Sequence, residues 1–313
     1  VDLWNLKGGR RAHTIHLDVT PHDLAFSALS SQLVYHYSSL VGLYPMKEDA
    51  PRFHRNLSIE SRSKGHRSRR GIVFTPDDER FYVGTKFNLE MWAPDQEQPL
   101  LSKRIAIDSE ASINPVTISP TGTLLAVAPG ASIVKILDAK NLDVLHAIPV
   151  AGTQALEFSP NGKVLAVACS QDFARLYDVA SGTPISSPFR HEDDVMFISF
   201  SPPTAADPEG GRWLATADRG GVLRIWETDS HLALMPPLRH GSSLTKVQFF
   251  PDGRRVLTTT EDHVLTVWGL PSPSKLTPEE SSALIRFLSR RRYDEQGDLE
   301  HLSNADLGSE WQS

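Results

Sequence analysis

The residue types that most often carry chemistry occur in this chain without a recognisable catalytic or metal-binding spacing. Twelve histidines and one cysteine, Cys169, are spread over 313 residues. His13 and His16 lie three residues apart, but no cysteine or carboxylate cluster lies beside them to complete a metal site. The segment from His191 to Asp194 contains three carboxylates that could hold a cation through oxygen, yet it leads into a predicted strand. We therefore interpret both groups as ordinary surface or core residues.

Other signatures of catalysis are absent from the sequence. It has no Gly-rich phosphate loop, no nucleophile elbow, no paired-cysteine motif and no helical zinc signature. We therefore expect no catalytic residue, no metal and no cofactor. A single cysteine cannot form an intrachain disulfide, which favours a reducing compartment and a cytoplasmic location. No run of 18 apolar residues occurs, so we expect no membrane-spanning segment.

One segment, residues 52–70, has a composition suited to binding anions. It carries a net charge of +6 in a chain whose net charge is -6. Its functional interpretation is contact with an anionic partner, and its alternative is a solvated basic loop between structural elements. The acidic balance of the whole chain and the lack of Phe, Tyr or Trp between Arg62 and Arg70 argue against nucleic acid. The candidate contact residues are Arg62, Lys64, Arg67, Arg69 and Arg70.

The elements that would position these residues are short strands in a repeat. A turn signal of an aromatic residue or Ile, a small polar residue and Pro recurs at intervals of 40 to 49 residues, anchored at Phe74, Ile118, Phe158, Phe200 and Phe249, with Phe250 in place of the small polar residue in the last copy. Apolar residues alternate before each turn and again after it, as strands buried on one face require. A third strand then ends in a large side chain, at Trp92, Leu137, Tyr177, Trp226 and Trp268. Groups this small cannot bury their own faces, so the period predicts a β-propeller.

These blades resemble the WD-repeat family over residues 1 to 270. The last copy is the best match, with His240, the Pro251-Asp252-Gly253 turn and Trp268. In that family His, Ser or Thr, Asp and Trp of one blade form a buried hydrogen-bonded network. The resemblance therefore assigns His240, Thr258, Asp262 and Trp268 to such a network. His191 has the matching offset one blade earlier, but Gly220 stands where Asp is expected, so we expect that blade to lack the complete network.

The repeat also gives a blade count and a domain boundary. Trp4 matches the last strand of a truncated seventh blade, so we expect six complete four-stranded antiparallel blades after it, and we interpret the chain as part of a longer polypeptide. Residues 1–270 would form the propeller, and residues 271–313 a linker, an amphipathic α-helix and a tail. Thr277-Pro278-Glu279-Glu280 is a capping box that predicts a helix over 278–291. This helix either docks a partner or folds back on the propeller.

The family resemblance implies a function without catalysis. Blade loops would present a rigid surface for a protein or peptide, and the divergent repeats resemble bacterial multidomain proteins in which such repeats often follow a Ser/Thr kinase domain. A kinase domain upstream would make the chain part of a larger signalling protein. The competing hypothesis is a propeller enzyme or small-molecule sensor, which requires several titratable groups converging at one mouth of a central channel.

Overall fold

The described part of the chain consists of strands, as the repeat predicts. The computed structural model describes residues 71–270 apart from 86, 97, 106–112 and 131, and strands at 2–5, 10–14, 23–26, 32–37, 40–45, 57–58, 291–293 and 299–301. Within these residues every named element is a β-strand, so the all-β prediction is confirmed for them. No helix in this part is long and apolar enough to cross a membrane.

Five sheets contain four strands each, and within each sheet consecutive strands of the chain pair antiparallel. The first comprises β3 (Asp23–Phe26), β4 (Gln32–Tyr37), β5 (Leu40–Pro45) and β6 (Leu57–Ser58). The second comprises β7 (Ile72–Phe74), β8 (Phe81–Gly84), β9 (Asn88–Trp92) and β10 (Leu101–Arg104). The third comprises β11 (Ile113–Ile118), β12 (Leu124–Pro129), β13 (Ile133–Asp138) and β14 (Val144–Pro149).

The remaining four-stranded sheets have the same order. The fourth comprises β15 (Thr153–Phe158), β16 (Val164–Cys169), β17 (Phe173–Asp178) and β18 (Phe189–Arg190). The fifth comprises β19 (Val195–Phe200), β20 (Trp213–Asp218), β21 (Val222–Glu227) and β22 (Leu238–Arg239). Four strands in simple succession are the unit of a propeller blade.

The ends of the chain depart from the predicted count. The sixth sheet has three strands among the described residues, β23 (Leu244–Phe249), β24 (Arg255–Thr260) and β25 (Leu265–Gly269). Trp4 lies in β1 (Asp2–Asn5), which pairs with β2 (Arg10–Thr14) in a two-stranded sheet rather than standing as a single last strand. Six complete blades are therefore not observed in the described part, and the blade number stays a prediction.

The chain divides into two compact units, which are residues 1–269 and residues 270–313. In the second unit, β26 (Arg291–Tyr293) pairs antiparallel with β27 (Leu299–His301). Residues 271–290, which hold nearly all of the predicted helix, lie outside the described residues. Arg291, predicted to end that helix, is the first residue of a strand.

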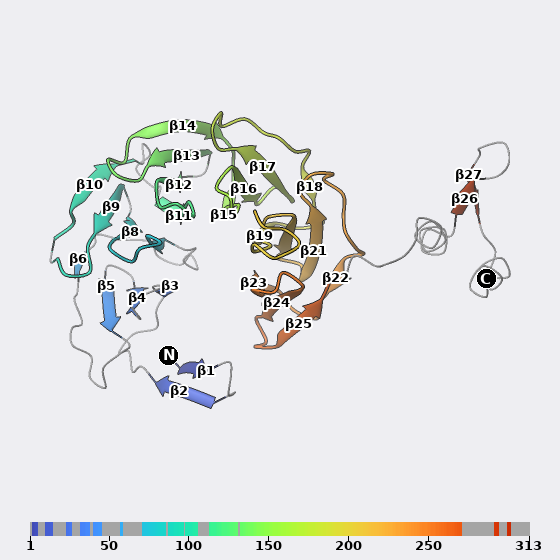
Figure 1. Ribbon diagram of the computed structural model, residues 1–313, viewed down its shortest axis with the longest axis horizontal. Coiled ribbons are helices and arrows are strands. Elements are labelled where there is room, and N and C mark those ends of the chain that lie inside the picture. Colours follow the sequence, from blue (N-terminus) through green and yellow to red (C-terminus); the bar gives the residue numbers. More distant parts are fainter. Residues whose placement is uncertain are drawn as a thin grey trace. The chain divides into compact units, whose positions relative to one another are not determined.

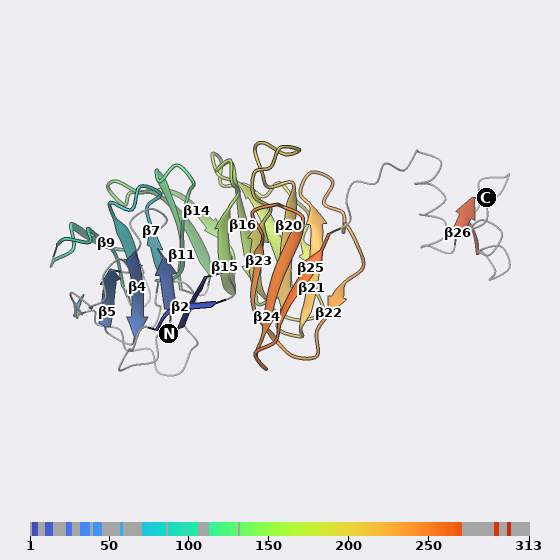
Figure 2. The same cartoon turned by 60° about the horizontal axis from the view of Figure 1, so that its bottom comes forward.

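Successive sheets of the first unit lie side by side through their first strands. Contacts join β3 to β7, β7 to β11, β11 to β15, β15 to β19 and β19 to β23. Figure 1 shows these first strands innermost and the later strands of each sheet progressively farther out. Figure 2 shows the strands standing next to one another, with the connecting loops at their two ends. This is the radial arrangement of propeller blades.

The hydrophobic core lies between the sheets rather than inside any one of them. One cluster joins Leu89 and Met91 of the second sheet to Val116 and Leu125 of the third. Further clusters join the third sheet to the fourth and the fourth to the fifth. Period-two alternation gives each strand one face for each neighbouring sheet, which is why both faces of the middle strands are apolar.

The last sheet shows what happens where this packing is incomplete. Leu265 and Val267 of β25 are 62% and 45% exposed. Leu223 and Ile225, which have the same register in β21, are both 0% exposed. The apolar pattern of the sixth sheet is therefore that of an internal blade, although the described residues bury only one of its faces.

The turns between first and second strands are built by hydroxyl side chains. Ser119 Oγ accepts a hydrogen bond from the Leu124 amide at 3.0 Å, and Ser159 Oγ accepts one from the Val164 amide at 3.0 Å. Equivalent bonds run from Arg80 to Thr75 at 3.1 Å and from Trp213 to Ser201 at 2.9 Å. Each hydroxyl closes its turn from inside in four sheets, and the bonded residues are five positions apart in three of these sheets and twelve apart in the fifth sheet.

Turns of successive sheets contact each other through glycine and proline. Gly122 has a φ of 73°, which favours glycine, and a Cβ there would lie 3.0 Å from Pro76 Cδ of the preceding sheet. Gly162 has a φ of 72° and faces Pro120 in the same way. The turn motif found in the sequence thus also determines how closely neighbouring sheets approach.

A second glycine constraint lies in the β8 strand and provides a test of the packing between sheets. A Cβ on Gly84 would lie 2.1 Å from the carbonyl oxygen of Ile113, whereas a Cβ on Gly241 would meet nothing within 4 Å. We expect Gly84→Ala to force the second and third sheets apart and to lower the free energy of unfolding by about 1–3 kcal/mol. Urea denaturation measures this, with Gly241→Ala as the matched control. Equal midpoints for the two variants would contradict the close approach.

Candidate functional site

A complete buried hydrogen-bonded network lies in the fifth sheet. Trp226 Nε1 donates to Thr216 Oγ1 at 2.7 Å, and Thr216 Oγ1 lies 2.7 Å from His191 Nε2. His191 Nδ1 lies 2.9 Å from Asp218 Oδ2, and the side chains of His191 and Asp218 are 0% and 1% exposed. With the proton on Nδ1, every donor in this chain of bonds has an acceptor. The other carboxylate oxygen of Asp218 accepts from the Val222 amide at 2.8 Å.

This finding corrects the expectation that the His191 blade lacks the network. Counting residues along the turn puts the expected carboxylate at the position of Gly220. The structure instead places it two residues after Thr216, at the end of β20, where alternate side chains of one strand share a face. Counting two residues along β20 from Thr216, which lies on the strand next to that of Trp226, would have identified Asp218.

The sixth sheet brings together three of the four residues assigned to its network. Thr258 Oγ1 lies 2.9 Å from His240 Nε2 and accepts from Trp268 Nε1 at 3.0 Å. His240 Nδ1 donates to the carbonyl oxygen of Gly221 at 3.0 Å instead of reaching a carboxylate. Asp262 does not join them, because it accepts a hydrogen bond from Thr260 at the exposed end of the sheet.

The third and fourth sheets have neither an indole nor an imidazole at these positions, whereas in the second sheet Trp92 Nε1 donates to Glu90 Oε2 at 3.2 Å. Leu137 and Tyr177 stand where the last two sheets have Trp, and they are 0% and 5% exposed. Val127 and Val167 replace the hydroxyl residue and are both fully buried. Without a buried indole or imidazole, these sheets need no polar partner there.

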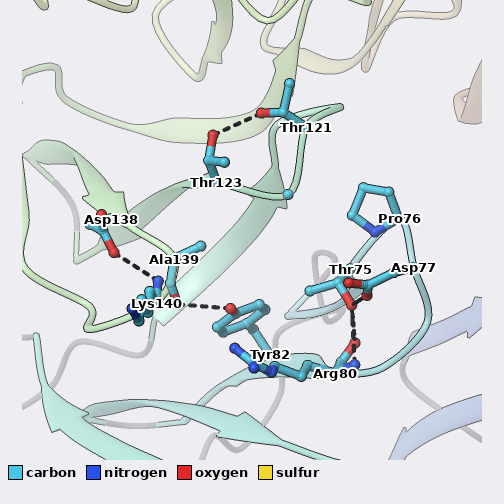
Figure 3. A pocket seen from close by; sticks show the side chains of 11 residues that line it. Thr75, Pro76, Asp77, Arg80, Tyr82, Thr121, Thr123, Asp138, Ala139 and Lys140 are labelled. Atoms are coloured by element: carbon cyan, nitrogen blue, oxygen red, sulfur yellow. Dashed lines mark hydrogen bonds between the residues drawn. The ribbon is translucent and has the colours of Figure 1, made fainter.

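A groove of about 450 Å³ lies between the second and third sheets. Three turns line it, and the side chains drawn in Figure 3 come from Thr75 to Tyr82, from Thr121 to Thr123 and from Asp138 to Lys140. The Tyr82 hydroxyl donates to the carbonyl oxygen of Ala139 at 2.8 Å and so joins the two sheets beneath the groove. Burial raises the pKa of Tyr82 above its ordinary value, so this hydroxyl stays a donor at neutral pH.

The groove carries two carboxylates, both engaged in their own turns. Asp77 Oδ1 accepts from the Thr75 hydroxyl and from the Glu79 amide, and these bonds lower the pKa of Asp77 below its ordinary value. Asp138 Oδ1 accepts from the amides of Lys140 and Asn141 at 2.8 and 3.2 Å. Both side chains therefore act as turn-forming acceptors. This groove cannot be predicted from the sequence, because its residues are up to 65 positions apart.

An acidic cluster includes two carboxylates of the segment from His191 to Asp194. Carboxylate oxygens of Asp172, Asp193 and Asp194 lie within 4.8 Å of one another. Asp193 Oδ1 accepts from the Asp194 amide at 2.7 Å, and Arg219 Nη1 lies 3.3 Å from Asp194 Oδ2. His191 faces the buried network instead. We therefore keep the interpretation of this segment as a partly neutralised surface loop.

Groups with raised pKa values do not converge on one place in the described residues. Burial raises the pKa of Tyr82 and Glu90 in the second sheet, and the pKa of Cys169 and Tyr177 in the fourth. The cluster of titratable groups that the enzyme or sensor hypothesis requires is not found among them.

The other candidate residues cannot be placed. Arg62, Lys64, Arg67, Arg69 and Arg70 lie outside the described residues, as does His16. His13 lies in β2, of which only the strand pairing is described. Contact of the basic segment with an anionic partner stays a prediction.

The network makes a prediction about two aspartates. Asp218→Ala should leave the Nδ1 proton of His191 and the Val222 amide buried without an acceptor, which costs about 1–3 kcal/mol of unfolding free energy. Asp262→Ala, at an exposed position, should change it by less than about 0.5 kcal/mol. The urea denaturation midpoints of the two variants measure this difference. A larger loss of stability for Asp262→Ala than for Asp218→Ala would show that the buried carboxylate has been assigned to the wrong residue.

The buried cysteine makes a second prediction. Cys169 is 0% exposed, and burial raises the pKa of its thiol to about 12. At pH 8 only about one thiol in ten thousand is then ionised in the folded chain, whereas an unfolded cysteine with a pKa near 8.5 is substantially ionised. We expect Ellman's reagent to label the native chain far more slowly than the chain in guanidinium chloride. Rapid native labelling that Cys169→Ala abolishes would contradict the buried position.

Comparison with known proteins agrees with this geometry. Residues 151–202 match the model of the anaphase-promoting complex subunit 4 WD40 domain, and residues 237–269 match the model of the WD domain, G-beta repeat. These matches include all four strands of the fourth sheet, β19 and β22 of the fifth, and the three described strands of the sixth. No family model outside the WD group is needed to account for the matched residues.

The chain is also similar to several WD-repeat and related proteins. It is 29% identical to nuclear distribution protein PAC1 of Arthroderma benhamiae, over 55% of this chain and 39% of that protein. It is 28% identical to periodic tryptophan protein 2 of Saccharomyces cerevisiae, over 39% of this chain and 13% of that protein. It is 27% identical to an uncharacterized WD repeat-containing protein of Synechocystis, over 51% of this chain and 46% of that protein. The chain thus spans less than half the length of these relatives, and two of its segments, residues 151–202 and 237–269, are similar to WD40 repeats.

Proposed function

We propose that this chain is a non-catalytic interaction scaffold whose blade loops hold a protein or peptide partner. WD40 domains generally bind protein partners, and the two family matches support that class of function here. The observation that carries the proposal is the contrast between the constant frame and the variable loops. The hydroxyl-closed turns repeat in four sheets, whereas the charged residues beside them differ from sheet to sheet.

Such a frame suits recognition more than catalysis. Loops held by a stiff β scaffold can present side chains to a partner without being ordered on binding, which lowers the entropic cost of association. For the described groups with raised pKa values, burial in the cores is the largest cause of the shift. We therefore assign the chain no catalytic residue and no cofactor.

The wider setting is also proposed from the resemblance. We infer that the chain is part of a larger signalling or regulatory protein of the cytoplasm, in which a kinase domain precedes the repeats. The names of the similar fungal proteins refer to nuclear distribution, but they describe proteins of which this chain covers 39%. We transfer only the scaffold role from them.

The basic segment offers a direct test of where a partner binds. We expect Arg67→Ala, Arg69→Ala and Arg70→Ala together to weaken capture of an anionic protein partner, and to do so less as salt rises, since screening acts over about 8 Å at physiological salt. Affinity capture from a lysate of the source organism, at low and high salt, with quantitative mass spectrometry, measures the loss.

A triple variant with the same loss of charge provides the control. Arg212→Ala, Arg254→Ala and Arg255→Ala remove three exposed cations from the described sheets. Partner capture that falls only with the first variant supports the basic segment. Equal capture by both variants would exclude that segment, and failure of the wild-type chain to retain any stoichiometric partner would contradict the scaffold function itself.

A further inference from the structure

The turn between β15 and β16 contains Asn161 followed by Gly162, the pair of residues in which asparagine is most prone to deamidation. The other six asparagines of the chain are followed by Leu, Pro or Ala. In deamidation the backbone nitrogen of the following residue attacks the side-chain carbonyl carbon of asparagine, and a side chain on that residue hinders the attack. Gly162 has no Cβ, so Asn161 is the asparagine at which this reaction meets the least steric hindrance.

The reaction needs no reactant other than water. Bond formation between the Gly162 nitrogen and Asn161 Cγ expels the side-chain amide as ammonia, which takes the proton of the Gly162 amide, and a cyclic imide remains. Water then opens the imide at one of its two carbonyl groups. The product is aspartate or isoaspartate, and in both cases a neutral amide has become a carboxylate.

Both reacting groups are held by hydrogen bonds within the folded turn. Asn161 Oδ1 accepts from Ser159 Oγ at 2.7 Å and from the Lys163 amide at 3.0 Å. The Gly162 amide donates to the carbonyl oxygen of Ser159 at 2.8 Å, so the hydrogen of the attacking nitrogen points toward Ser159. The attack on Asn161 therefore requires the bond between Gly162 and Ser159 to open.

The amide nitrogen of Asn161 is held by the neighbouring sheet. Asn161 Nδ2 donates to Glu209 Oε2 at 3.0 Å, and Lys163 Nζ lies 3.4 Å from the same oxygen. Glu209 belongs to the connection between β19 and β20, which is longer than the corresponding connections of the other described sheets. The hydrogen bond from Asn161 lowers the pKa of Glu209 below its ordinary value, so this carboxylate is charged at neutral pH.

The product carboxylate suits the turn but not this neighbour. Asp77 and Asp252 occupy the equivalent turn positions of the second and sixth sheets, and each accepts from the amide two residues further on. A carboxylate at position 161 can keep the same bond to the Lys163 amide. It has no proton to donate to Glu209, however, and two carboxylates whose oxygens lie 3.0 Å apart repel each other.

We propose that Asn161 is a modification site of this chain, at which deamidation replaces a hydrogen bond between the fourth and fifth sheets by a repulsion, and that Glu209 slows the reaction in the folded state. Pro160, beside Asn161, lies against the same connection of the fifth sheet, since a Cβ on Gly210 would lie 3.0 Å from Pro160 Cβ. The modification therefore acts where these two sheets approach each other. This inference does not depend on the scaffold function proposed above.

The rate of deamidation tests the role of Glu209. The purified chain is incubated in mildly alkaline buffer, and peptide mapping by mass spectrometry measures the conversion of each asparagine over time. We expect Glu209→Ala to speed conversion at Asn161 about threefold, because it removes one hydrogen bond from the amide that must rotate. The matched control is Glu192→Ala, which removes a carboxylate 64% exposed against 66% for Glu209 and should leave the rate at Asn161 unchanged.

The effect of the product is measured separately by exchanging donor and acceptor. Asn161→Asp places a carboxylate opposite Glu209, and we expect it to lower the urea denaturation midpoint. Adding Glu209→Gln should restore the midpoint, because the glutamine amide can donate to the new carboxylate. Glu209→Gln alone completes the cycle of variants and shows the effect of that change on its own.

The outcomes separate clearly. Faster conversion at Asn161 in Glu209→Ala, together with a midpoint restored in the double variant, supports the proposal. It is overturned if Glu209→Ala and wild type convert Asn161 at the same rate, if the other asparagines convert as fast as Asn161, or if Asn161→Asp leaves the midpoint at its wild-type value.

Discussion

The structure depends on apolar contact between neighbouring sheets, because no sheet of this chain can bury its own faces. A four-stranded antiparallel sheet exposes two surfaces, and here the clusters of fully buried side chains span the junctions between sheets. Everything else described follows from that constraint. Turns must bring the sheets to a fixed distance, first strands must lie next to each other, and any concave surface must form at a junction.

Hydrogen bonds of polar side chains also join neighbouring sheets at these junctions. Glu157 accepts from the Phe200 amide at 3.2 Å, and Ser199 accepts from the Phe249 amide at 3.2 Å, so first strands are linked by side chain to backbone bonds across two junctions. Within the sheets, the position beside the third strand is filled in two ways. The fifth sheet uses indole, hydroxyl, imidazole and carboxylate, and the fourth uses Val167 and Tyr177. In the fifth sheet each polar group of the network has a partner, and in the fourth sheet Val167 brings no polar group that needs one.

The sequence predicted the strands and their sheets well, because alternation and turn residues are local properties. The positions of Trp92, Leu137, Tyr177, Trp226 and Trp268 at or near the ends of third strands all follow from it. Asp218 was missed because the turn of the fifth sheet was aligned by its length, whereas the network depends on strand register. The groove could not be predicted, since its three turns meet only after two sheets pack together.

The exposed face of the sixth sheet affects the order in which the sheets unfold. When each unit is held mainly by the units on either side, the free energy is a sum of nearest-neighbour couplings, and a unit with one coupled face opens before units with two. The outward positions of β25 are about half exposed where those of β21 are buried. Amide protons of β23 to β25 would then exchange through local fraying, while those of the third and fourth sheets exchange through larger openings. A propeller of this kind is a chain of linked equilibria more than a single cooperative block.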